Sequence, residues 1–99
     1  YFLNYRRFVA IAEEHLRYSG EVQAVLTSGP ARECLTLRLE TSKAVDADQT
    51  RDTFLAAYPE VRSAVDERLL DFAVEVVDGA DLDRTATSGK LRAVVDRRR

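Results

Sequence analysis

The first segment of the chain carries apolar residues every three or four positions, which is the period of one buried helix face. This spacing predicts a helix from Tyr5 to Leu16. The apolar residues of the predicted face are Tyr5, Phe8, Val9, Ala12 and Leu16. Asn4 stands where a side-chain oxygen caps a helix, and Ser19-Gly20 provides a signal for its end.

Two runs with strand character follow this helix. The clearest is Cys34 to Thr41, in which leucines alternate with polar residues. Because successive side chains of a strand point to opposite faces, this run predicts one buried face and one wet face. Glu21 to Ser28 has apolar residues at both sets of alternating positions and predicts a strand that is not one-sided. Gly29-Pro30-Ala31-Arg32 predicts a turn, so the two strands should form an antiparallel hairpin.

The second half of the chain opens with another helical pattern. Asp46 and Gln49 stand at the spacing of a capping box, and Phe54 belongs to the apolar stripe that follows. Pro59 should interrupt this helix or begin a new one, since proline fits only the first turn of a helix. Helical spacing continues from there to Leu69.

A third strand is predicted from Leu70 to Val77, before a break at Asp78-Gly79. Ala80 to Gly89 is polar and turn-prone, and Lys90 to Val95 is a short extended piece or final strand. The order helix-strand-strand-helix-strand, followed by a lysine loop, predicts an α+β fold. We expect a single domain over residues 1–99, with helices packed against a small three-stranded mixed sheet. The long helical connection allows the third strand to run parallel to a neighbour.

Composition narrows the range of partners. The 99 residues are 45% hydrophobic, which is ordinary for a globular domain. Fifteen Lys and Arg against seventeen Asp and Glu give a net charge of −2, which offers no electrostatic case for nucleic acid. No apolar run approaches a membrane span, so no membrane partner is expected. The single cysteine, Cys34, excludes an internal disulfide and indicates a reducing compartment, which points to a cytoplasmic protein.

Lys90 is the strongest candidate for chemistry, because it follows a Ser88-Gly89 turn in the polar segment after the third strand. A flexible ammonium at the end of a loop can contact two anionic groups at once. Held in place, it stabilises charge that develops in a transition state. Glycine before it lets the backbone turn tightly and approach a ligand. The alternative is a surface turn with a solvated lysine.

The stretch Asp83-Arg84-Thr85-Ala86-Thr87-Ser88-Gly89-Lys90-Leu91-Arg92 resembles the C-terminal signature of the adenylate-forming enzymes, the acyl-CoA ligase superfamily. The run from Gly89 onward is most similar to the phenylacetate–CoA ligase branch. In that family a Thr/Ser-Gly-Lys turn carries the lysine that reaches the ATP and carboxylate site. The resemblance implies a catalytic role for Lys90, with Ser88 and Gly89 as loop support. Arg84 matches the family's arginine, which orders the loop or touches a partner group; a solvated arginine is the alternative.

The resemblance further implies that residues 1–99 form the small C-terminal lid domain of an ATP-dependent carboxylate–CoA ligase. Such an enzyme converts carboxylate and ATP to an acyl-adenylate, from which the CoA thiol displaces AMP. The implied partners are the enzyme's own N-terminal adenylation domain, outside this chain, and a small carboxylic acid. ATP and CoA are then substrates, and Mg accompanies ATP in the complete enzyme. This domain alone is expected to bind none of them and to be inactive.

A non-catalytic small-molecule-binding or dimerisation module is the alternative, since small α+β domains serve many functions. Because the strand from Glu21 to Ser28 is not one-sided, a homodimer that covers one of its faces is a further expectation. The chain also contains no methionine and begins at Tyr1 in an apolar stretch. From this we expect a segment cut from a longer protein; disordered leading residues that the sequence does not include are the alternative.

The remaining reactive residues favour structural roles. His15, the only histidine, is expected to be structural or exposed rather than a metal ligand or a base. Cys34 at the start of a strand is expected to be a small buried hydrophobe rather than a nucleophile. The aspartates between residues 78 and 83 lack the glycine and closing glutamate of a calcium loop, so no metal site is predicted. The basic tail at residues 97–99 is a solvated end or a weak phosphate contact.

Overall fold

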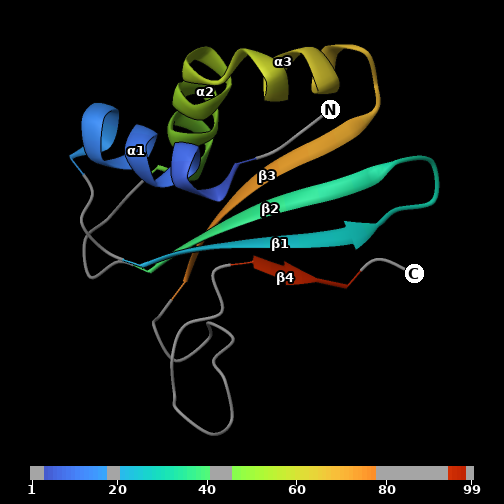
Figure 1. Ribbon diagram of the computed structural model, residues 1–99, viewed down its shortest axis with the longest axis horizontal. Coiled ribbons are helices and arrows are strands. Elements are labelled where there is room, and N and C mark those ends of the chain that lie inside the picture. The colour runs from blue at the N-terminus through green and yellow to red at the C-terminus, as the bar shows by residue number, and fades with distance from the viewer. Residues whose placement is uncertain (1–3, 18–20, 41–45, 78–93, 98–99) are drawn as a thin grey trace, which may run out of the picture.

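The computed structural model describes residues 4–17, 21–40, 46–77 and 94–97 of the chain. These residues form two layers, with the helices stacked on one face of a sheet (Figure 1). The elements are α1 (Tyr5–Leu16), β1 (Val22–Ser28), β2 (Glu33–Glu40), α2 (Ala47–Ala57), α3 (Pro59–Asp66), β3 (Leu70–Val77) and β4 (Val94–Asp96). The predicted α+β class is therefore confirmed, and so are the bounds of the first helix and the third strand.

The sheet is mixed and has the strand order β3-β2-β1-β4. Strands β1 and β2 form the predicted antiparallel hairpin. The connection through α2 and α3 is long enough for β3 to return parallel to β2. At the opposite edge, β4 pairs with β1 in parallel.

The expectation of a three-stranded sheet is wrong, because β4 adds a fourth strand; it begins within the piece from Lys90 to Val95 that the sequence predicted as extended or as a short final strand. Three residues are too few to show the alternation by which a strand is recognised in a sequence. The pairing partner of β4 also lies near the other end of the chain, so no local pattern marks it. Pairing continues past the strand, where the Arg97 amide donates to the Leu26 carbonyl at 2.7 Å.

Helix α1 begins and ends through identifiable hydrogen bonds. The Asn4 side chain accepts from the Arg6 amide at 3.0 Å, as predicted for an N-cap. At the other end Arg17 adopts a left-handed conformation with φ of 51°, and its amide bonds to the Ala12 carbonyl. The expected stop signal at residues 19–20 lies outside the described residues. Ile11, which the predicted face omitted, is fully buried with Phe8 and Ala12.

Four aromatic rings from separate elements meet beneath the helices. The ring centroid of Phe8 lies 6.0 Å from that of Phe54, 5.0 Å from that of Tyr58 and 6.2 Å from that of Phe72. Offset and tilted rings at these separations attract beyond their buried area. The cluster thereby joins α1, the α2–α3 junction and β3 into one core.

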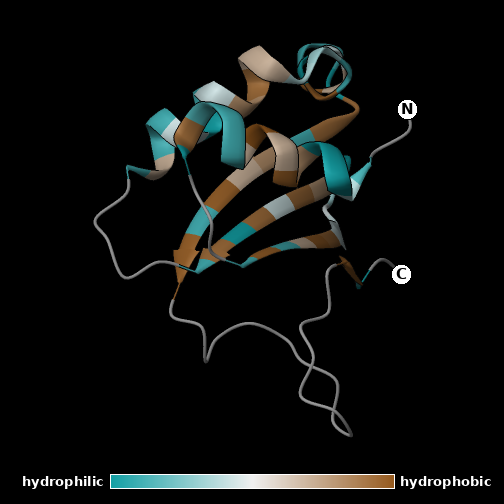
Figure 2. Ribbon diagram, turned by 60° about the vertical axis from the view of Figure 1, so that its left-hand side comes forward, coloured by the Kyte–Doolittle hydropathy of each residue, from teal (hydrophilic) through white to brown (hydrophobic). Residues whose placement is uncertain are grey.

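Hydrophobic and hydrophilic residues alternate along strand β2, as its sequence predicts (Figure 2). Leu35, Leu37 and Leu39 are buried under the helices, whereas the intervening residues are only half-buried on the opposite face. We call this opposite face the second face. Strand β1 is not one-sided, as expected, because Val22 to Val25 are buried at four consecutive positions.

Two local signals operate as the sequence indicates. Pro59 begins a separate helix, α3, because its missing N–H costs nothing in a first turn. In the hairpin turn, the Gly29 amide donates to the Arg32 carbonyl at 2.9 Å. A β-carbon on Gly29 would lie 2.8 Å from that same carbonyl oxygen, closer than van der Waals contact permits. Glycine is therefore required at position 29, because the Arg32 carbonyl leaves no room for a β-carbon.

Replacing Phe8 with alanine tests whether the aromatic cluster holds the layers together. We expect Phe8→Ala to lower the free energy of unfolding by about 3–5 kcal/mol, because it removes a fully buried ring and leaves a cavity. Urea denaturation followed by circular dichroism measures this loss. Leu69→Ala is the control, since Leu69 is 51% exposed and should change stability by less than about 0.5 kcal/mol. Equal losses in the two variants would contradict the cluster's role.

The N-cap of α2 gives a second stability test. The Asp46 carboxylate accepts from the Asp48 and Gln49 amides at 2.9 and 3.1 Å. We expect Asp46→Ala to cost about 1 kcal/mol and Asp46→Asn to cost much less, since asparagine also caps. Asp52→Ala, on the exposed side of the same helix, is the matched control. A loss in Asp46→Asn as large as in Asp46→Ala would show that charge, not capping, is responsible.

Candidate functional site

The lysine turn predicted from the sequence lies in residues 78–93, outside the described residues. Lys90, Ser88, Gly89 and Arg84 all belong to this segment, so their roles stay predictions. What the structure does describe is the pair of strands that bound the segment. Strand β3 ends at Val77 and β4 begins at Val94.

These two boundary residues lie at the same end of the sheet. Val77 is in register with Glu40 at the end of β2, and Val94 is in register with Ala24 near the start of β1. The hairpin places these ends together, since the Glu40 amide donates to the Glu21 carbonyl at 3.1 Å. The two strands occupy opposite edges of the sheet. The described residues that flank the segment carrying Lys90 therefore lie at opposite edges and at the same end of the sheet (Figure 1).

The same end of the sheet is tied to α1 through Tyr5. Its hydroxyl donates to the Val22 carbonyl. Burial raises the pKa of Tyr5 above its ordinary value of 10.0, and the Glu21 carboxylate raises it further. Both effects disfavour the phenolate, so the hydroxyl keeps its proton and its hydrogen bond at neutral pH.

Other polar side chains gather on the second face. Arg38 pairs with Glu75 at 3.5 Å, and Arg32 pairs with Asp71 at 3.6 Å, each joining β2 or its turn to β3. Beside Arg38 lies a hollow of about 250 Å³. The sequence reasoning did not identify this group, although Arg38 at the centre of an alternating strand was a signal for it.

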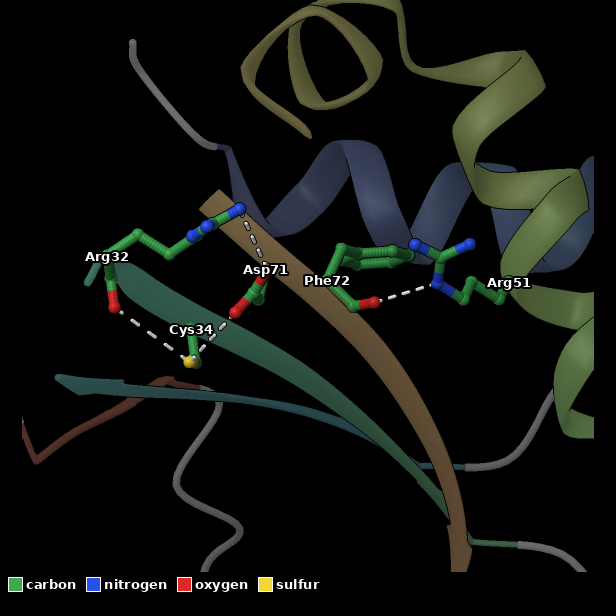
Figure 3. A network of polar contacts seen from close by, with 5 residues as sticks. All are labelled: Arg32, Cys34, Arg51, Asp71 and Phe72. Atoms are coloured by element: carbon green, nitrogen blue, oxygen red, sulfur yellow. Dashed lines mark hydrogen bonds and ion pairs between the residues drawn. The ribbon is translucent and has the colours of Figure 1, made fainter. Parts of the chain in front are cut away.

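Cys34 lies next to the Arg32–Asp71 pair (Figure 3). Its Sγ is 3.9 Å from Asp71 Oδ2 and 4.0 Å from the Arg32 carbonyl oxygen. The residue is half-buried, so the expectation of a small buried hydrophobe is met only in part. The cause is its place at the start of β2 on the second face, where no helix covers it. Neither of these contacts is the histidine that commonly activates a cysteine nucleophile.

His15 is exposed in the last turn of α1, in agreement with a structural or surface role. Within the described ranges, no cluster of three or more His, Cys, Asp or Glu residues could hold a metal ion. The aspartates between residues 78 and 83 fall outside those ranges. None of the helices in the described part of the chain is long and apolar enough to cross a membrane.

The raised pKa of Tyr5 predicts a specific pH dependence of stability. A pKa raised in the folded state gives stability that is present below about pH 10 and is lost as the pH rises through the folded value. Tyr5→Phe cannot ionise, so its free energy of unfolding should fall less steeply above about pH 10 than that of the wild type. Denaturation at a series of pH values measures both slopes. Parallel curves would show that Tyr5 ionisation does not contribute.

Comparison with known proteins gives a likeness among solved structures but none in sequence. No protein-family model matches the chain, and no curated protein matches it. Among solved structures, the chain is similar to a domain of phenylacetate–coenzyme A ligase from Bacteroides vulgatus. The two superpose with a TM-score of 0.43 at 16% sequence identity, over 92% of this chain and 83% of that one.

Proposed function

We propose that this chain is the mobile C-terminal domain of an ATP-dependent carboxylate–CoA ligase of the phenylacetate–CoA ligase type. The observation that carries the proposal is the stretch from Asp83 to Arg92, which sets Lys90 behind a Ser-Gly turn with an arginine upstream. In this role the domain supplies Lys90 to an active site that it shares with a nucleotide-binding domain outside this chain.

The chemistry explains why a lysine is needed. Adenylation brings a carboxylate against the α-phosphate of ATP, and both groups are negatively charged. The Lys90 ammonium contacts both and reduces their repulsion as the acyl-adenylate and pyrophosphate form. Mg accompanies ATP on the other domain, and a cytoplasmic location supplies ATP, CoA and a reduced thiol.

The anchoring of residues 78–93 supports this arrangement. A functional loop held at both ends by a rigid scaffold can be presented to a partner domain without disturbing the core. After adenylation the domain rotates and offers another surface while the CoA thiol displaces AMP. Closure of this kind keeps water away from a reactive intermediate. The isolated chain should therefore fold but catalyse neither step.

The decisive experiment separates the two half-reactions in the complete enzyme. We expect Lys90→Ala to slow acyl-adenylate formation from free acid and ATP by on the order of a hundredfold or more, which corresponds to about 3 kcal/mol. Thioester formation from presynthesised acyl-adenylate and CoA should change little, because the lysine acts only while the two anions meet.

Lys43→Ala is the matched control, since Lys43 is the only other lysine in the chain and carries the same charge. Its adenylation rate should stay close to that of the wild type. Near-normal adenylation by Lys90→Ala would remove the basis of the proposal and favour a non-catalytic module. Equal losses in both half-reactions would indicate a damaged domain interface instead.

A further inference from the structure

The second face of the sheet contains an arginine whose hydrogen bonding is incomplete. Arg38 stands at the centre of β2, in register with Gln23 of β1 and Glu75 of β3. Its side chain is only 18% exposed. Within the described part of the chain, its buried Nε has no hydrogen-bond acceptor. Glu75 Oε2 is 3.5 Å away, beyond the roughly 2.7–2.9 Å of a charge-assisted hydrogen bond.

Such a donor is expensive to leave unsatisfied. Removing a charged N–H from water without an acceptor loses its solvation, and a distant carboxylate offsets only part of that loss. The exposed Arg62–Asp66 pair on α3 has no such problem, since both side chains remain largely in water. The Arg38 Nε–H therefore needs a hydrogen-bond acceptor, whereas the guanidinium of an exposed ion pair can bond to water.

The hollow beside Arg38 has the right chemistry to supply that acceptor. The described residues that line it are Val25, Thr27, Thr36, Arg38, Glu75 and Arg97. They offer two guanidinium groups and two hydroxyls against a single carboxylate, so cationic and neutral donors predominate. At about 250 Å³ the hollow is smaller than the roughly 300–1,000 Å³ of typical organic-ligand sites.

We propose that this hollow binds a small oxyanion, a phosphate or a carboxylate group, through the Arg38 guanidinium. The guanidinium plane presents paired N–H groups that match two oxygens of such a group. Thr27 and Thr36 donate hydroxyls from the flanking positions, and Arg97 adds a second positive charge. Binding of this kind requires neither Lys90 nor the adenylation role.

The Glu75 carboxylate competes with the oxyanion for the Arg38 guanidinium. Its side chain is 57% exposed, so it can turn toward water when an oxyanion takes its place beside Arg38. Neutralising Glu75 should therefore strengthen oxyanion binding, while neutralising Arg38 should weaken it. If the Arg38–Glu75 pair were only structural, neutralising either residue would have the same effect on oxyanion affinity.

The test is an NMR titration of the isotope-labelled chain with inorganic phosphate and, separately, with acetate, observing the Arg38 Nε–H resonance. We expect a saturable shift in the wild type, a loss of affinity of about tenfold or more in Arg38→Gln, and tighter binding in Glu75→Gln. Arg38→Lys should bind with intermediate affinity, because it keeps the charge but not the fork. Arg62→Gln is the matched control and should leave the affinity unchanged.

The two probes identify the source of the oxyanion. Tighter binding of phosphate points to a phosphorylated ligand, and tighter binding of acetate points to a carboxylate. Absence of saturation below about 10 mM with both probes would overturn the proposal. Weaker binding in Glu75→Gln would overturn it as well. The Arg38 resonance reports on the wild type directly, so the result stands even if Arg38→Gln fails to fold.

Discussion

Packing of Phe8 against three other aromatic rings is the contact on which the rest of the structure depends. These rings come from α1, α2, the α2–α3 junction and β3, which are far apart in the sequence. In a small domain the buried fraction of the surface is limited, so a few large side chains supply much of the core. Hydrogen bonds at the edge of the core then hold the helices in position. Arg7 Nη2 donates to the Ala57 carbonyl at the end of α2, and Arg51 Nε donates to the Phe72 carbonyl of β3 (Figure 3).

Placing every helix of the described residues on one face gives the two sides of the sheet different chemistry. The covered side is a continuous core of leucine, phenylalanine and valine. The second face carries cross-strand ion pairs and the hollow beside Arg38. Helices of the described residues cover only one side of this layer; on the second face Gln23 and Val25 are buried, whereas Arg38 and Glu75 keep part of their side chains exposed. The proposed oxyanion site lies on this second face, beside Arg38, and contains no residue of the core cluster.

Strand β4 determines where the chain rejoins the sheet after the segment with the lysine turn. Without it, everything after β3 would be a tail attached at one point. Parallel pairing of β4 with β1 instead fixes the far end of residues 78–93 to the opposite edge of the sheet. The strands on either side of residues 78–93 are thus placed by the sheet, at its two opposite edges.

The sequence by itself determined the local elements, because their signals lie within a few residues. Helical spacing, the caps at Asn4 and Asp46, the alternation in β2 and the new helix at Pro59 all operate over one or two turns. It also provided the lysine turn, as a motif whose role is still a prediction. Only the tertiary structure decided which strands β3 and β4 pair with, and that Arg38 lies half-buried beside Glu75. Those features depend on contacts between residues distant in the chain, for which local periodicity carries no information.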